Sequence, residues 1–580
     1  MAEEEHPEHD RKQPRFYQVD VRNLPKYYTM PDFKKLINKT LRLNGFNFKF
    51  YGGQNSPLVS VCFNSGAEME NAILVIKNYV WRKKVLSAQK SARPQKISES
   101  HKRTIDMVDD NDEGNGRSDV DDDNDNDEDE DGGPKKMQRM DPKLSDTDKL
   151  RNAFIPLWKK EYKDQLAMKQ MQAWRIFKEV ANELKKVNPT LTEWIEQQKN
   201  LHDDMPCELL DVRHGNNPTG YRNHCVFNIG LDPKTEQASV GFKLNTYING
   251  FKAIAQPDGL MHIPEKIIVA VKAFQDMLRT RMNRQDLRYP AEIIIRSSRD
   301  QLLLLINQYP RSRPQEDRER FEKITIDYFS NGPGKSSGVT SLYTKREGKR
   351  VQNYYLWGER LFYEYPLDLT IKIFPDGFYP TNSEAAQIFY KTALEFVGPV
   401  TNSTVIDLCC GLGTLGLCFA KNCKLVLGVD TVKMCTQYAI ENAGKNKIKN
   451  ASFYTGKAQD LAGQMYNKAL GDDVVVVCDP PRSGLHEKAI FHIRNSPKIK
   501  KILYVSINPK SGLNVYKNLA KAQSKKVHGD PFVPTKAVPL DMNPHTNVTH
   551  IISLWERWSI VKNRNQQPVN VDKCSQIDLT

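Results

Sequence analysis

The sequence lacks any long hydrophobic run. No window approaches the ~18 uninterrupted apolar residues that a membrane-spanning helix needs, so we expect no membrane partner. The N-terminus, MAEEEHPEHD, is acidic and polar, which argues against a secretory signal. These absences favour a cytoplasmic and/or nuclear location.

The sequence also lacks a cysteine framework. None of its ten cysteines forms a CxxC pair, and five crowd the stretch 409–435. Such clustering is typical of small buried thiols in a reducing compartment rather than of disulfides. No His/Cys spacing favours a metal site, so we predict none.

Charge of both signs is present but unevenly distributed. The net charge is +14, yet the stretch from Asp109 to Asp131 holds 14 acidic residues and one arginine, so the remaining chain carries about +27. A body this basic predicts a polyanionic partner, most plausibly nucleic acid.

Shifts in composition divide the chain into six predicted segments. They are a folded region at 14–92, a disordered acidic linker at 93–147, a helical segment at 148–205, an α+β middle domain at 206–374, an alternating βα domain at 375–562 and a disordered tail at 563–580. The linker has too little apolar surface to offset the entropy of ordering. In the βα domain, strands of nearly continuous Val, Ile and Leu alternate with helices, which predicts a doubly wound, mostly parallel sheet.

The region 14–92 has the element order βαββαβ, which resembles an RNA-recognition motif (RRM) with its ferredoxin-like fold. The positions where such a sheet presents aromatic rings to RNA hold Asp20, Leu58 and Ser60. Stacking on a base needs a π face, so these residues disfavour RNA binding by the sheet. Docking of a protein partner is the competing interpretation.

A glycine-rich turn in the βα domain indicates a cofactor site. In "DLCCGLGTLGL", Asp407–Leu417, a strand ends and Gly411, Gly413 and Gly416 allow a tight turn into a helix. The next strand ends at Asp430, where an acid can accept hydrogen bonds from ribose hydroxyls. This combination resembles motif I of the class I S-adenosylmethionine (SAM) methyltransferases, which implies a Rossmann-like C-terminal domain.

Several further blocks resemble the RNA 5-methyluridine methyltransferases, a family that includes the tRNA (uracil-5-)-methyltransferases. These blocks are "RNHCVFNIG", "SGVTSLY", "FPDGFYPTN", "CDPPRSGLH", "YVSINP" and "PFVPTKAVPLDMNPHT". The resemblance implies that a cysteine thiolate adds to carbon six of uracil, that carbon five takes a methyl group from SAM, and that a carboxylate then removes the proton from carbon five. The middle domain is expected to contribute to binding of the tRNA substrate.

When the family's site residues are mapped onto this chain, some of the positions hold a residue of matching chemistry. Asp479 matches the aspartate of the DPP motif, which in the family holds the uracil near the cofactor. Asp430 retains an acid at the ribose position, and Cys409 and Thr414 match positions that line the cofactor together with Gly411 and Gly413.

The chain departs from the family at three other positions. Ile507 stands at the position of the nucleophilic cysteine, His550 at that of the catalytic glutamate, and Pro380 at that of a glutamine that contacts the cofactor. No cysteine occurs between Cys478 and Cys574, and Glu556 lies six residues beyond His550, about 20 Å along a strand.

These departures leave three hypotheses open. The chain is a pseudoenzyme that binds tRNA and SAM without forming 5-methyluridine, or an active RNA methyltransferase that uses an unrecognised nucleophile or different methyl chemistry. In the third hypothesis it is a protein-interaction adaptor whose Rossmann-like domain is only a folded body.

Overall fold

The computed structural model describes residues 17–91 and 144–566, apart from internal gaps at 26–29, 42, 44–45, 51–57, 64–65, 83, 249–250, 285, 289, 309–313 and 348–350. The chain divides into two compact units, Met1–Asn124 and Asp125–Thr580. Most of the predicted acidic linker, and the tail from residue 567 on, lie outside the described residues.

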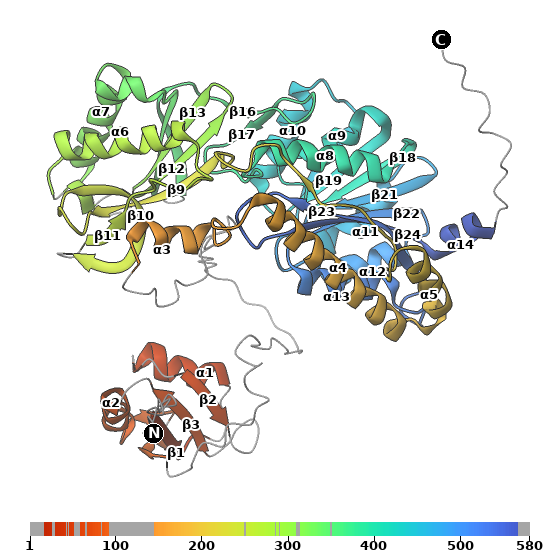
Figure 1. Cartoon of the computed structure of the whole chain (residues 1–580), viewed down its shortest axis with the longest axis horizontal. Coiled ribbons are helices and arrows are strands. Elements are labelled where there is room, and N and C mark those ends of the chain that lie inside the picture. The colour runs from red at the N-terminus through yellow and green to blue at the C-terminus, as the bar shows by residue number, and fades with distance from the viewer. Residues whose placement is uncertain are drawn as a thin grey trace, which may run out of the picture. The chain divides into compact units, whose positions relative to one another are not determined.

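The N-terminal unit is a four-stranded antiparallel sheet with two helices (Figure 1). Its sheet order is β2-β3-β1-β6, and a small β4–β5 hairpin precedes β6. The elements are β1 (Tyr17–Arg22), α1 (Met30–Lys35), a π-helical turn (Leu36–Thr40), β2 (Phe46–Phe50), β3 (Leu58–Phe63), α2 (Gly66–Ile76), β4 (Val80–Trp81), β5 (Lys84–Val85) and β6 (Ser87–Lys90). Valines that alternate along β1 and β3 form its core with Phe33, since alternate residues of a strand face the same side.

Two positions of this sheet differ from the sequence-based expectation. Asp20 and Ser60, placed on the exposed face, are both buried, and the Ser60 hydroxyl donates a hydrogen bond to the Asp20 carboxylate. They are directly opposite each other on β1 and β3, so the pair satisfies its own polar groups.

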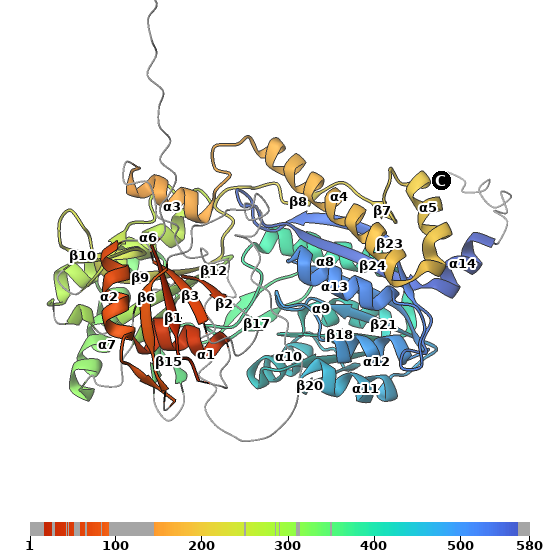
Figure 2. The same ribbon diagram turned by 90° about the horizontal axis from the view of Figure 1, so that it is seen from below.

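The second unit begins with three helices, α3 (Asp146–Phe154), α4 (Tyr162–Val187) and α5 (Thr192–Leu201). Apolar residues of α4 recur at helical spacing, and Phe177, Val180 and Leu184 lie in the core formed with the C-terminal sheet. Figures 1 and 2 show α4 lying along the side of that sheet next to β23. Helices α4 and α5 are therefore part of the C-terminal domain's packing, whereas Leu150 of α3 lies in the core of the middle region.

The middle region is a seven-stranded sheet in the order β10-β11-β9-β12-β13-β14-β15, with α6 and α7 packed in its core. The elements are β9 (His224–Leu231), β10 (Ala238–Ile248), β11 (Phe251–Ala255), α6 (Glu265–Arg281), β12 (Pro290–Ser298), β13 (Gln301–Gln308), α7 (Gln315–Ser330), β14 (Ser341–Glu347) and β15 (Val351–Gly358). The hairpin β16 (Phe362–Glu364) and β17 (Ile371–Ile373) leads from it into the C-terminal domain. This α+β architecture matches the predicted one.

The C-terminal domain is built on a nine-stranded sheet in the order β20-β19-β18-β21-β22-β24-β23-β7, with β8 also paired to β23. Its strands are β18 (Val400–Leu408), β19 (Cys423–Asp430), β20 (Ala451–Thr455), β21 (Asp473–Cys478), β22 (Ile499–Ser506), β23 (Phe532–Asp541) and β24 (His550–Arg557). Its helices are α8 (Ser383–Val397), α9 (Thr414–Phe419), α10 (Lys433–Lys445), α11 (Ala458–Lys468), α12 (Glu487–Asn495), α13 (Pro509–Ala520) and α14 (Trp558–Gln566). The strands from β20 to β22 run parallel, and β24 runs antiparallel between β22 and β23. The predicted doubly wound sheet is confirmed.

Two predicted boundaries differ from the observed elements. The short strands β7 (Glu208–Leu209) and β8 (Arg213–His214), assigned to the middle domain, hydrogen-bond to β23 and extend the C-terminal sheet. The predicted tail at 563 begins too early, because α14 continues to Gln566 and Arg564 forms an ion pair with the buried Glu556.

Two features are absent from the described residues. No helix among them is both long and apolar enough to cross a bilayer. No group of three or more His, Cys, Asp or Glu side chains among the residues that the structure describes is arranged to hold a metal ion.

Candidate functional site

The predicted site residues meet at one edge of the C-terminal sheet. Cys409 follows β18, Asp479 follows β21 and Ile507 follows β22, and the carboxyl ends of parallel strands share an edge. The antiparallel strand β24 starts at this edge with His550. Because Ser506 lies opposite Ile551, Ile507 and His550 are cross-strand neighbours.

The turn after β18 has the backbone of a ligand cradle. Cys409, Gly411 and Gly413 adopt positive φ angles of 75°, 51° and 80°, and the N–H groups of Cys409 and Cys410 both donate to the Val429 carbonyl at 2.9 Å. A Cβ on Gly413 would lie 2.9 Å from the Cβ of Ala439, whereas one on Gly411 would meet nothing within 4 Å. Gly413 therefore packs against the protein while Gly411 faces open space.

Asp430 ties together the two loops beside this cradle. Its Oδ2 accepts a hydrogen bond from the Gly411 N–H at 2.9 Å, and its Oδ1 accepts one from the Val432 N–H at 2.8 Å. A carboxylate has about four lone-pair sites, so acceptor capacity remains on both oxygens. The predicted ribose-binding role is compatible with this geometry.

Two further carboxyl groups of the site lie in a desolvated environment. Burial raises the pKa of Asp407 to about 7, and the nearby carboxylates of Asp479 and Asp430 add to the shift. Its Oδ2 accepts from the Gly416 N–H at 2.9 Å, but its buried Oδ1 has no partner. Burial likewise raises the pKa of the partly buried Asp479 to about 7. An unpartnered acceptor beside an open cradle fits a ligand that brings a hydrogen-bond donor.

The aliphatic side chain of Ile507 carries no reactive group at the position predicted for the nucleophilic cysteine. Among the described residues, the thiols near this edge include Cys478, which is completely buried, Cys410, which is also buried, and Cys409, which is partly exposed and contacts the Cys478 thiol. The hydrogen bond with Cys409, together with burial, raises the pKa of Cys478 well above its ordinary value. Since β21 lies between β18 and β22, Cys409 is about 10 Å, two strand spacings, from position 507.

His550, at the position predicted for the catalytic base, lies in an unusual electrostatic environment. Burial lowers its pKa to about 3, and the cations Lys169 and Arg482 contribute to the shift. Its Nδ1 is buried without a hydrogen-bond partner. Glu556 lies at the far end of β24 opposite Lys501 and pairs with Arg564 at 2.9 Å, so it does not reach the site.

The loop that carries Pro380 is held by main-chain contacts from the middle sheet. Asn223, just before β9, donates its side-chain amide to the Pro380 carbonyl at 3.0 Å and its N–H to the Thr381 carbonyl at 2.8 Å. Arg296 of β12 donates to the Gly377 carbonyl. The sequence analysis missed these residues, because their partners are backbone atoms about 80–160 positions away.

Asn382 joins this loop to the β23–β24 connection. Its Oδ1 caps α8 by accepting the Ala385 N–H at 3.0 Å, and its Nδ2 donates to the Met542 carbonyl at 3.2 Å. An asparagine before the helical pattern "SEAAQIF" is a recognisable N-cap signal, so this residue could have been found from the sequence.

Comparison with known proteins places this arrangement in a family. The family model described as tRNA (Uracil-5-)-methyltransferase matches residues 368–528. A mouse protein named tRNA (uracil-5-)-methyltransferase homolog A is 30% identical over 554 residues, which cover 93% of this chain and 84% of the mouse protein. The chain belongs to the tRNA (uracil-5-)-methyltransferase family.

The chain is also similar to two further proteins. The human tRNA (uracil-5-)-methyltransferase homolog B is 30% identical over 71% of this chain and 84% of its own length. The solved structure of the Pyrococcus abyssi tRNA (uracil-54, C5)-methyltransferase in complex with S-adenosyl-L-homocysteine aligns with a TM-score of 0.48 at 17% identity, covering 68% of this chain and 83% of that one.

Family membership confirms the predicted cofactor, SAM, and the class I methyltransferase body. The residues present fit that group. Gly411 leaves open space, Asp430 retains acceptor capacity for ribose hydroxyls, and the free Oδ1 of Asp407 can accept from an ammonium group. Thr414 begins α9 next to this cradle and is buried. Pro380 has no side-chain amide to offer.

Proposed function

We propose that this chain binds tRNA and SAM but does not form 5-methyluridine. The supporting observation is the aliphatic side chain at position 507, where the family's mechanism needs a thiolate. An isoleucine has no lone pair with which to add to carbon six of uracil. The nearest partly exposed thiol, that of Cys409, lies two strands away on the cofactor side of the sheet.

The state of His550 supports the same proposal. With its Nδ1 buried and without a partner, the imidazole loses less by placing a lone pair there than an N–H, since orphaned buried donors are rare. The proton of the neutral ring then sits on Nε2, the nitrogen that is not enclosed. In this state His550 donates a hydrogen bond through Nε2, and its one lone pair, on the buried Nδ1, cannot reach the proton on carbon five.

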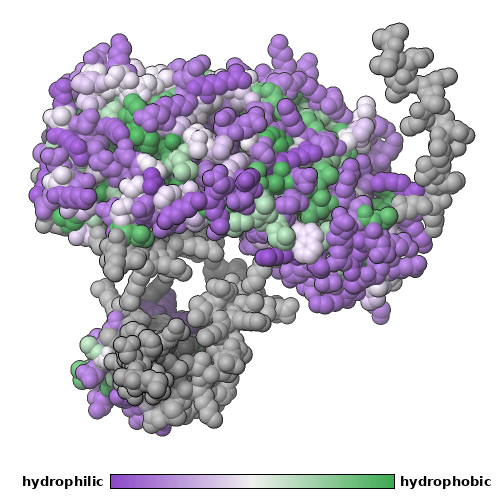
Figure 3. All heavy atoms as spheres, in the orientation of Figure 1, coloured by the Kyte–Doolittle hydropathy of each residue, from purple (hydrophilic) through white to green (hydrophobic). Residues whose placement is uncertain are grey.

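Binding of tRNA is supported by charge and by the names of the relatives. About +27 of formal charge lies outside the acidic stretch, and Figure 3 shows mainly hydrophilic residues on the visible face of the large unit. Because each phosphate neutralised by a cation releases a counterion, tRNA affinity should fall steeply between 50 and 200 mM salt. Salt-independent binding would contradict this part of the proposal. We place this activity in the cytoplasm and/or nucleus.

We further propose an RRM-like role in protein docking for the N-terminal unit. Its strand order β2-β3-β1-β6 and two helices are compatible with that fold. Asp20 and Ser60 are buried and bonded to each other, so neither offers a stacking surface to RNA.

The decisive test is a covalent-trapping assay with tRNA that contains 5-fluorouridine. In the family reaction the fluorine cannot leave as a proton, so a catalytic thiolate stays attached to carbon six. We expect the wild-type chain to give no denaturant-stable protein–RNA band and no transfer of tritium from methyl-labelled SAM. The double variant Ile507→Cys/His550→Glu is the matched positive control, and Ile507→Ser/His550→Glu has a similar geometry without a thiol.

Each outcome separates the hypotheses. A stable band from the wild-type chain would show that another nucleophile exists, and its loss in Cys409→Ser would identify that nucleophile. Tritium transfer without a band would indicate different methyl chemistry. If neither tRNA nor S-adenosylhomocysteine binds in a shift assay and in calorimetry, the chain is an adaptor.

A further inference from the structure

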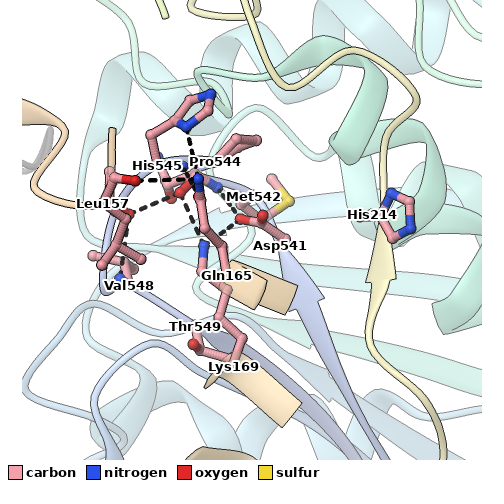
Figure 4. A network of polar contacts seen from close by, with 12 residues as sticks. Leu157, Gln165, Lys169, His214, Asp541, Met542, Pro544, His545, Val548 and Thr549 are labelled. Atoms are coloured by element: carbon pink, nitrogen blue, oxygen red, sulfur yellow. Dashed lines mark hydrogen bonds and ion pairs between the residues drawn. The ribbon is translucent and has the colours of Figure 1, made fainter. Parts of the chain in front are cut away.

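Hydrogen bonds and an ion pair join one face of α4 to the connection between β23 and β24, residues 542–549 (Figure 4). Three α4 residues spaced four and three apart, Gln165, Lys169 and Gln172, project from this face. The Gln165 Oε1 accepts the His545 N–H at 2.8 Å, and the Thr549 hydroxyl donates to the Gln172 Oε1 at 2.9 Å. Between them, Lys169 donates to the Asp541 Oδ1 at 2.5 Å and to the Asn543 carbonyl at 3.0 Å.

The centre of this contact is a buried ion pair. Lys169 is 2% exposed and Asp541 is completely buried, and burial lowers the pKa of Lys169 despite its partner. The second carboxylate oxygen of Asp541 accepts from the Tyr162 hydroxyl at 3.0 Å, and the Asn543 N–H also donates to Asp541 at 3.1 Å. Such a pair contributes little net stability compared with apolar packing, but it specifies geometry because each partner is costly to leave alone.

This connection ends directly at the site. Thr549, held by Gln172, precedes His550, and Asp541, held by Lys169, ends the strand next to it. The charged groups that act on the His550 ring are Lys169 of α4 and Arg482 of the loop after β21. The helix that precedes the middle domain in the sequence therefore forms a wall of the site.

We propose that Lys169 is a positioning residue of this site. Through its contacts with Asp541 and Asn543, Lys169 fixes the β23–β24 connection, and this keeps Nδ1 of His550 buried and Nε2 as the accessible ring nitrogen. The N–H on Nε2 can donate to a carbonyl oxygen of a uracil base. The identity of that ligand rests on the proposed function, whereas the effect of Lys169 on His550 does not.

The test is a nitrogen-15 and carbon-13 NMR titration of the histidine rings in the full-length chain, with the His550 signal assigned from a His550→Gln sample. In the wild type we expect a single Nε2–H tautomer that stays neutral down to pH 5. In Lys169→Gln the enclosing contact is lost and a cation is removed, so we expect mixed tautomers and a midpoint raised by about half a unit or more. Lys169→Arg, which keeps the charge and can still reach Asp541, should stay closer to the wild type.

Two variants keep the test informative. Lys169→Gln/Asp541→Asn removes both charges and leaves no unpaired ion, so it serves if the single variant does not fold. We again expect mixed tautomers, with a smaller rise in the midpoint, because the loss of the Asp541 carboxylate opposes the loss of the Lys169 cation. Gln172→Ala removes a contact of the same face without changing any charge, so the midpoint should not rise by the same amount. If Lys169→Gln lowers the melting temperature but leaves the tautomer and midpoint of His550 unchanged, Lys169 is only structural and the proposal is wrong. Failure of tRNA binding in the wild type would refute the proposed function alone.

Discussion

Replacing Asp430 with alanine tests whether the site still binds SAM. The change removes two charge-assisted hydrogen bonds, from the Gly411 N–H at 2.9 Å and the Val432 N–H at 2.8 Å. Such bonds contribute roughly 1.5–3 kcal/mol each when fully desolvated. Asp430 is only partly buried, so water replaces part of the loss. The substitution also removes the carboxylate oxygens that are predicted to accept hydrogen bonds from the ribose hydroxyls of SAM.

We therefore expect SAM affinity to fall by about 1–3 kcal/mol, a factor of roughly 5 to 150 in Kd. Isothermal calorimetry with SAM, and competition with S-adenosylhomocysteine, measure this change. Asp472→Ala is the matched control, because that exposed carboxylate lies just before β21, at the opposite edge of the sheet. An unchanged Kd in Asp430→Ala would refute the assignment of the cradle, and absence of binding heat in the wild type would mean that the pocket is vestigial.

Three further predictions concern stability. Gly413→Ala should lower the free energy of unfolding, measured by urea denaturation, by about 2–4 kcal/mol, because φ is 80° and the new methyl group lies 2.9 Å from Ala439. Gly444→Ala on α10 is the control, because its new methyl group meets nothing within 4 Å and should not destabilise the protein. Burial raises the folded-state pKa of Asp407 to about 7, above its unfolded value, so the stability that the protonated carboxyl group contributes to the fold should be lost as pH rises from 4 through 7. The melting temperature should therefore decline over this pH range, and Asp407→Asn should flatten the decline. Arg494→Met should lower the free energy of unfolding by more than about 3 kcal/mol in chemical denaturation, since it leaves one buried and three partly buried carbonyls without their donor.

The sheet and the motif turn could be predicted because their signals are local. Valine-rich runs such as Asp473–Cys478 form central strands, and the glycines after β18 adopt the positive φ angles that their pattern implies. The strands β7 and β8 could not be predicted, since each has two residues and exists only through pairing with β23, more than 300 positions away.

The wall of the site formed by α4 was also beyond sequence reasoning. Gln165 and Lys169 are polar residues in a helix with an apolar stripe, a pattern typical of a solvated face. Both are buried because their partners, His545 and Asp541, come from the other end of the chain. The periodicity of residues along one helix cannot predict a polar contact with a partner more than 370 positions away in the sequence.

The residues at the carboxyl ends of the strands differ in how strongly they support ligand binding by this chain. Gly413 packs against Ala439, and Asp430 bridges two loops, so folding alone is enough to explain both. Asp479 is different, because burial raises its pKa to about 7 and its ionised form therefore opposes folding at neutral pH. Under the proposed function, a uracil base edge with an N–H donor compensates for this cost. Under the proposed function, Ile507 and His550 do not supply the chemistry of the family's reaction, whereas Asp479 and Asp407, whose pKa values burial raises to about 7, are the residues that folding alone explains least well.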